Sequence, residues 1–394
     1  MTLEITGGDL VLPDRVVPAG TLRIDGERIT DVAEGSVRAG GVAHLDARDC
    51  IVVPGFIDVH VHGVNGCDVL DGHGAIARIA SDLTRFGVTA FCPTTVACSP
   101  ESLRRVLEEI SSLQAQPIAG QARVLPAHLE SNFINPVMRG AQPAEHLRVP
   151  FGEDPRAQMY SGGDILRVIM SFTPAVGIVT VAPELPGGLE LVRTLTAAGL
   201  IVSLGHSTAD WETANAAFDA GARHATHLFN RMPSLGHHEP GVVGAVLSRD
   251  DVMAELICDG YHVHPSVARM AILLKGVDRI LAITDGTAGS GLATGSCARI
   301  GGRSLEVRED AAYLADGTMA GSILTMDAAF RMAMTLSRES WMDAARMCAT
   351  SPARALGLHN RGIIAPGAMA DLVVLDRSLR VRQTCIAGRI VYSC

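Results

Sequence analysis

Between about residues 54 and 355, short apolar runs alternate with longer segments whose apolar residues recur every three or four positions. The short runs have the length of buried strands, and the longer segments have the spacing of helices with one buried face. Strands are predicted at 56–61, 89–93, 123–128, 178–182, 201–205, 224–227, 252–257 and 280–284. Helices are predicted at 76–86, 102–113, 188–198, 211–220, 267–274, 326–337 and 341–349. Eight strands that alternate with helices predict an α/β fold, a parallel (β/α)₈ TIM-like barrel.

Both ends of the chain show a different pattern, in which short alternating runs are separated by turns without a helical period. The runs lie at 3–5, 9–12, 20–24, 29–32 and 51–53, and again at 362–367, 370–376 and 384–391. Because a few short strands cannot bury their apolar faces alone, both ends are predicted to build one small β-sandwich domain. The predicted boundaries are 1–53 for its first part, 54–359 for the barrel and 360–394 for its second part.

Polar side chains stand at the carboxyl ends of five predicted barrel strands, where the active site of such a barrel lies. They are His60, His62, Glu130, His206, His227 and Asp285. A single strand-end histidine is more often structural, and His128 is interpreted in that way. Five strands that end in imidazoles and carboxylates predict a metal centre of one or two divalent ions, with Zn, Fe and Mn as candidates.

Composition and charge narrow the function further. The 33 Lys and Arg residues are outnumbered by 42 Asp and Glu residues, which is the wrong balance for a nucleic-acid partner. No apolar run approaches the ~18–20 residues of a membrane span, and the first residues do not resemble a signal peptide. The nine cysteines form no CxxC pair, so reduced thiols in a cytoplasmic protein are predicted, with neither membrane nor nucleic acid as a partner.

Several motifs carry a resemblance to known proteins. PGFIDVHVHG at 54–63, the strand ends at His206 and His227, ITDGT at 283–287 and ADLVVLD at 370–376 resemble the amidohydrolase superfamily. Within it, the chain resembles the N-acetylglucosamine-6-phosphate deacetylase family over essentially its whole length. The motifs are AHLE at 127–130, LGHSTA at 204–209, ATHLFNRMP at 225–233, EPGVVGAVL at 239–247, CDGYHVH at 258–264, DGTMAGSILTM at 316–326 and SPARALGL at 351–358.

The resemblance implies a role for each candidate residue. Glu130, His206 and His227 match the main metal site, and His60 and His62 match a pair that makes a second ion possible. Asp285 matches the catalytic aspartate, which we expect to move protons. The residues expected on the substrate side are Gln142, Asn230, Arg231, His238 and His262, with His262 also a catalytic candidate. The alternatives are an uninvolved, exposed Arg231 and a solvent-facing His262. The family also implies a homodimer.

Three positions depart from the family pattern, all on the substrate side. Ser131-Asn132 replaces Gly-Pro after the glutamate, Gln142 replaces a histidine, and His238 replaces an arginine that reaches a neighbouring subunit's phosphate. Imidazole is a weaker phosphate clamp than guanidinium, so amide hydrolysis is better supported than the 6-phosphate.

Three functions are therefore weighed. The first is removal of acetate from an N-acetylated amino sugar, with N-acetylglucosamine 6-phosphate giving glucosamine 6-phosphate. The second is the same hydrolysis on an unphosphorylated or differently substituted acylamino sugar or related amide. The third is a non-catalytic scaffold, which the retention of all six candidate ligands argues against.

Overall fold

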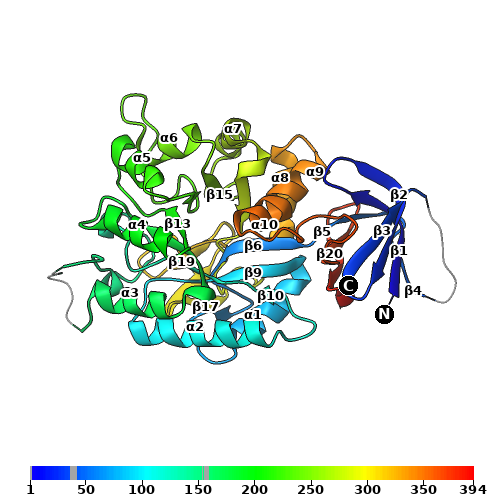
Figure 1. Ribbon diagram of the computed structural model, residues 1–394, viewed down its shortest axis with the longest axis horizontal. Helices are drawn as coiled ribbons and strands as arrows, with labels where there is room; N and C mark the ends of the chain where they lie inside the picture. The colour runs from blue at the N-terminus through cyan, green and yellow to red at the C-terminus, as the bar shows by residue number, and fades with distance from the viewer. Residues whose placement is uncertain (1, 36–41, 153, 155–158) are drawn as a thin grey trace.

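The computed structural model describes residues 2–35, 42–152, 154 and 159–394, and its larger part is a parallel barrel (Figure 1). The barrel strands are β6 (Phe56–Val61), β9 (Val88–Thr95), β10 (Arg123–Val124), β11 (Ala127–Leu129), β12 (Val176–Val181), β13 (Ile201–Leu204), β14 (His224–Ala225), β15 (Met253–Ile257) and β16 (Ile280–Ile283). Neighbouring strands pair in parallel, and a bridge between Val61 and Gly286 joins the first strand to the end of the last. The predicted (β/α)₈ barrel is confirmed.

The third barrel strand is divided in two, whereas the other strands differ from their predictions only in their end residues. It was expected to be continuous over 123–128, but it is divided into β10 and β11 around Pro126. Proline has no backbone N–H to donate to a ladder, so a break at this residue is the physical expectation.

Helices cover the outside of the barrel (Figure 1). Those that match predicted segments are α1 (Ala75–Asp82), α2 (Pro100–Ala115), α4 (Gly188–Ala197), α5 (Trp211–Asp219), α7 (Pro265–Lys275) and α8 (Met326–Leu336). The segment predicted at 341–349 is α9 (Trp341–Ala345), which continues through a π-helical turn, Arg346–Thr350, into α10 (Ser351–Ala355).

Two helices were not predicted. α3 (Gly162–Ser171) begins at a capping box in which Ser161 and Asp164 each accept a backbone N–H of the other. α6 (Gly241–Ser248) is almost entirely apolar and buried, so it has no polar face to reveal a helical period.

The strands of both chain ends lie in one mixed sheet of eight strands (Figure 1). They are β1 (Thr2–Val11), β2 (Val16–Asp25), β3 (Arg28–Ala33), β4 (Ala43–Asp46), β5 (Cys50–Pro54), β20 (Leu372–Asp376), β21 (Val381–Ile386) and β22 (Arg389–Ser393). The order is β22-β21-β20-β5-β1-β2-β3, with β4 beside β1. The prediction of a small β unit built from both ends is confirmed, and the boundaries at 53/54 and 359/360 stay a proposal.

A small antiparallel sheet after β16 was also not predicted. Its strands are β17 (Cys297–Ile300), β18 (Arg303–Val307) and β19 (Ala312–Leu314). The signal for it was present, because Gly301-Gly302 separates two alternating runs in the manner of a tight hairpin. A short hairpin, β7 (Gly63–Val64) and β8 (Cys67–Asp68), follows β6. Among the described residues, no helix has the length and apolar character that crossing a bilayer requires.

Deleting residues 371–394 is expected to destabilise the N-terminal strands. β20 pairs with β5 along its whole length, and Leu372 and Val374 pack in one buried cluster with Ile5 and Leu10 of β1. Hydrogen exchange should therefore show faster exchange throughout β1 and β5. Deleting only 388–394, which removes the largely exposed edge strand β22, is the control and should leave β1 and β5 protected. Unchanged protection in the longer deletion would contradict a shared domain.

Candidate active site and metal centre

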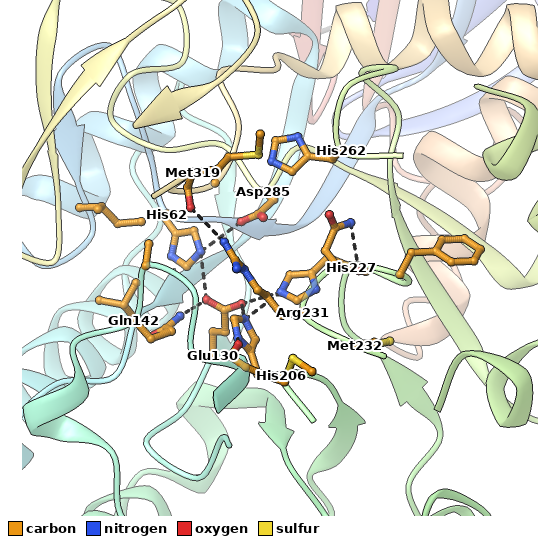
Figure 2. A pocket seen from close by; sticks show the side chains of 17 residues that line it. His62, Glu130, Gln142, His206, His227, Arg231, Met232, His262, Asp285 and Met319 are labelled. Carbon is orange, nitrogen blue, oxygen red and sulfur yellow. Dashed lines mark hydrogen bonds and ion pairs between the residues drawn. The ribbon is translucent and has the colours of Figure 1, made fainter. Parts of the chain in front are cut away.

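A cavity of about 380 Å³ opens at the carboxyl ends of the barrel strands (Figure 2). This volume lies within the range of small-molecule sites. The predicted residues that line it are His62, Glu130, Gln142, His206, His227, Asn230, Arg231, His262 and Asp285. His60 lies just beneath, fully buried, and contacts His62 and Asp285.

The first cluster of potential metal ligands is Glu130, His206 and His227, which follow β11, β13 and β14. Glu130 Oε1 lies 2.7 Å from His206 Nε2 and 2.8 Å from His227 Nε2. The two Nε2 atoms are 3.0 Å apart. His206 donates its Nδ1–H to the carbonyl of Met138, so Nε2 is the nitrogen that faces the cluster. The two histidines therefore converge on one point.

The second cluster is His60, His62 and Asp285, from the ends of β6 and β16. The Nε2 atoms of His60 and His62 are 3.3 Å apart, and Asp285 Oδ1 lies 3.4 Å from the first and 3.3 Å from the second. His62 donates Nδ1–H to the carbonyl of Thr94, which again leaves Nε2 for the centre. Glu130 Oε2 is 3.5 Å from His62 Nε2, so this carboxylate lies between the clusters.

Strained backbone marks the same region. Positive φ angles occur at His206 (48°), His227 (29°), Phe229 (78°), Arg231 (53°) and Asp285 (47°). Non-glycine residues adopt this left-handed conformation rarely and at a cost, so its concentration around one cavity indicates a functional site.

The electrostatics of the clusters fit a divalent ion. Burial disfavours the charged form of Glu130. His206 and His227 outweigh this effect through their charges and hydrogen bonds, and they hold the pKa of Glu130 well below its usual value. Asp285 is likewise held below its usual pKa, against burial, by His60 and His62. Two ionised carboxylates and four imidazoles with converging Nε2 atoms form a ligand set for Zn²⁺ and similar ions. Ligands of a tetrahedral ion lie roughly 3.3–3.6 Å apart, close to the separations in the second cluster.

Metal binding to the ion-free protein is expected to release protons and to strengthen as pH rises. Burial disfavours imidazolium at His62 and His227, but Asp285 and Glu130 overcome it and raise each pKa to about 9. Both histidines therefore carry protons at neutral pH, and an ion must displace them. Calorimetric titration with Zn²⁺ at pH ~7 should give a heat that depends on the ionisation enthalpy of the buffer. Affinity should increase between about pH 6 and 8; a buffer-independent heat and a flat affinity would contradict these protonation states.

The substrate side of the cavity holds four of the five residues that were predicted there. Gln142 accepts the backbone N–H of Ala97 and donates its amide to Glu130 Oε2, so it orients that carboxylate. His262 is largely buried, and its Nδ1 lies 2.6 Å from Asp259 Oδ2, so it is not a solvent-facing imidazole. Asn230 and Arg231 line the cavity on the loop after β14, with Arg231 exposed and 3.5 Å from the carbonyl of Met319.

His238 is the predicted substrate contact that lies apart from the others. Within one chain it lines a second cavity beside Trp211 and Pro240, and its ring packs on His237 at 4.1 Å. Its assignment to the substrate stays a prediction.

Two carboxylates beneath the clusters were not singled out from the sequence. Asp58 accepts the hydroxyl of Thr284 at 2.6 Å, and burial raises its pKa to about 7. Glu255 on β15 contacts the ring of His60 at 2.9 Å and the backbone of His227 at 3.0 Å. The available signal was a lone carboxylate inside an otherwise apolar strand, since such a group is costly without partners.

The chain is similar to known proteins over most of its length. The amidohydrolase family matches residues 51–391. The chain is similar to the N-acetylglucosamine-6-phosphate deacetylase of Lysinibacillus sphaericus, with 35% identity over 92% of this chain and 91% of that protein. It is also similar to the N-acetylgalactosamine-6-phosphate deacetylase of Escherichia coli O157:H7, with 35% identity over 92% and 93%. A mutant N-acetyl-D-glucosamine-6-phosphate deacetylase from Mycobacterium smegmatis, solved with N-acetyl-D-glucosamine-6-phosphate, matches with a TM-score of 0.88 and 32% identity over 100% and 99%.

Proposed function

The chain belongs to the amidohydrolase family, and we propose that it hydrolyses N-acetylglucosamine 6-phosphate to glucosamine 6-phosphate and acetate as a metal-dependent deacetylase. The observation that carries this proposal is the convergence of six ligand-type side chains from five barrel strands on one cavity beside Arg231. Amide hydrolysis needs an activated water, a polarised carbonyl and a proton for the departing amine, and the cavity offers groups suited to each.

One or two divalent ions would be held by these side chains, with Glu130, His206 and His227 as one set and His60, His62 and Asp285 as the other. Zn, Fe and Mn are the candidates, because imidazole and carboxylate ligands suit all three. When bound, such an ion supplies Lewis acidity for the amide carbonyl and for water.

Asp285 moves the protons in the proposed reaction. Its carboxylate is ionised at neutral pH and faces the cavity, so it can accept the proton of the attacking water. The same group then donates that proton to the nitrogen of the departing amine. Its position is fixed because its backbone N–H donates to the carbonyl of His60 and its carbonyl accepts from Ser322.

The cavity is also suited to an anionic substituent. Arg231 is the one permanent cation among the described residues that line it. Asn230 and His262 add hydrogen-bonding groups to the same lining. A phosphate needs such donors to offset its desolvation, so Arg231 is the proposed phosphate ligand.

The test is an acetate-release assay on a panel of acetamido sugars. The panel contains N-acetylglucosamine and N-acetylgalactosamine, each with and without the 6-phosphate. We expect N-acetylglucosamine 6-phosphate to have the highest kcat/KM. The second candidate substrate is an unphosphorylated or differently substituted acylamino compound. It is motivated by His238, which within a single chain lies outside this cavity. Equal kcat/KM with and without the phosphate would favour it.

Arg231→Ala is expected to raise KM for the phosphorylated sugar about 10-fold or more and to change KM for the plain sugar little. A charge-assisted hydrogen bond from guanidinium to phosphate is lost, at a cost of roughly 1.5–3 kcal/mol. Steady-state kinetics on both sugars measures this difference. Arg139→Ala, at an exposed arginine that does not line the cavity, is the control. An equal rise of KM for both sugars would remove the phosphate role from Arg231.

A homodimer remains part of the proposal. In it, His238 of one subunit would approach the substrate of the other, as the family resemblance implies. Sedimentation of the purified protein tests the dimer, and the KM of His238→Ala for the phosphorylated sugar tests the contact.

A further inference from the structure

Glu255 lies in the interior of the barrel, where a carboxylate is unexpected. It sits on β15 between Ala254 and Leu256, and its side chain is fully buried. A buried carboxylate persists only where hydrogen bonds replace the water that it has lost. The identity of its partners therefore indicates what it is for.

One oxygen of Glu255 holds two groups at the edge of the site. Oε2 lies 2.9 Å from His60 Nδ1 and 3.0 Å from the backbone nitrogen of His227, whose N–H it accepts. The amide of His227 thus fixes the oxygen, and the oxygen fixes the ring of His60. Because a carboxylate oxygen only accepts hydrogen bonds, Nδ1 of His60 must donate to it, so the ring carries its proton on Nδ1 and Nε2 is free.

The free nitrogen is the one that faces the centre. His60 Nε2 lies 3.3 Å from His62 Nε2 and 3.4 Å from Asp285 Oδ1. Rotation of the imidazole or a change of tautomer would direct a donor at this point instead of a lone pair.

Glu255 is not itself suited to hold an ion with its neighbours His60 and His128. The ring of His128 is already engaged, since Nδ1 lies 3.1 Å from the carbonyl of Val59 and Nε2 lies 2.9 Å from Thr180 Oγ1. A carbonyl only accepts, so Nδ1 must donate, and no lone pair of His128 faces Glu255. Beneath the cavity, therefore, Glu255 is hydrogen-bonded to His60, and His128 only packs against the ring of His60, with the ring centroids 4.5 Å apart.

We infer that Glu255 is a positioning residue of the metal centre, which fixes the tautomer and ring orientation of His60 so that Nε2 binds the second ion. This inference rests on the proposed metal-dependent function. Carboxylates that orient a metal-binding imidazole in this way typically change affinity by about 10–100-fold when removed.

The first test is binding of Zn²⁺ to the metal-free protein, measured by competition with a chromophoric chelator. The binding step that His60→Ala removes defines the His60-dependent ion. Glu255→Leu, of similar volume but without an acceptor, should weaken that step about 10–100-fold. Glu255→Gln keeps an acceptor oxygen and should restore part of the affinity. Glu4→Gln, which changes a buried glutamate of the terminal sheet, is the matched control and should bind like wild type.

A double-mutant cycle separates positioning from general damage to the structure. If Glu255 acts mainly through His60, Glu255→Leu should weaken the remaining Zn²⁺ step in the His60→Ala background less than it weakens the His60-dependent step, because only the contact with the backbone N–H of His227 is lost there. An equal loss in both backgrounds would overturn the inference, as would wild-type affinity in folded Glu255→Leu.

Nitrogen-15 NMR of labelled histidines gives a readout that does not depend on any variant folding. In the zinc-loaded wild type, His60 should carry hydrogen on Nδ1 and bind through Nε2. The opposite tautomer would overturn the inference. Wild-type protein that binds no ion would instead overturn the proposed metal-dependent function.

Discussion

Asp285→Asn is expected to lower kcat by about 10²–10⁴-fold, the usual contribution of a general acid–base group, while KM changes only a few-fold. Asparagine has the same shape and can accept a hydrogen bond, but it cannot take a proton from water and return it to an amine. Asp285 faces the cavity, and its pKa lies below the usual value in the ion-free protein, so it is ionised at neutral pH. The substitution therefore removes proton transfer with little change in the shape of the site.

The measurement needs a metal count beside the kinetics, because Asp285 also lies in the second ligand cluster. Variants should be compared at equal metal content, and binding of unreacted substrate should be measured directly. Asp371→Asn is the control, since Asp371 is a buried aspartate directly before β20, outside the cavity lining, that accepts the backbone N–H of Ala387. A nearly normal kcat in folded, metal-loaded Asp285→Asn would remove this residue from the mechanism.

The sequence predicted the barrel because apolar residues are spaced differently along its strands and its helices. The run 56–61 was predicted to its end residues and is β6, and 211–220 differs from α5 by a single residue. The same reasoning missed α6, whose eight residues are nearly all apolar and thus carry no helical period. The same reasoning predicted a continuous strand across Pro126, because a run of apolar residues does not reveal that proline lacks the backbone N–H of a strand pair.

The sequence predicted which strand-end residues lie at the cavity, but not the hydrogen bonds that orient their side chains. Strand-end residues such as His206 and His227 could be assigned to one end of the barrel, because parallel strands end together. The sequence does not contain the hydrogen bonds that orient them, such as that from Gln142 to Glu130. Nor does strand position place a residue on a long loop, and His238 lies on one, beside a second cavity. Glu255 was missed because it lies inside a strand rather than at its end.

Glu130→Gln is expected to lower kcat/KM by at least about 10³-fold through loss of the metal. Glu130 is the only carboxylate of the first cluster, and one of its oxygens faces the Nε2 atoms of both His206 and His227. A neutral amide supplies no charge to an ion there, and it can turn its NH₂ group toward the site. Lewis-acid stabilisation is worth several kcal/mol, and each ~1.36 kcal/mol is a tenfold change in rate.

Metal removal from the wild type provides the reference for this variant. A chelator should abolish acetate release, and added Zn²⁺, Mn²⁺ or Fe²⁺ should restore it, with the most effective ion indicating the native one. Glu130→Gln should contain less metal by elemental analysis and should not recover at the ion concentration that restores the wild type. Because Glu130 lies between both clusters, its loss should weaken the second ion as well, whereas Glu255→Leu should weaken chiefly the His60-dependent ion. Full activity of the wild type after complete metal removal would show that the six side chains act without an ion.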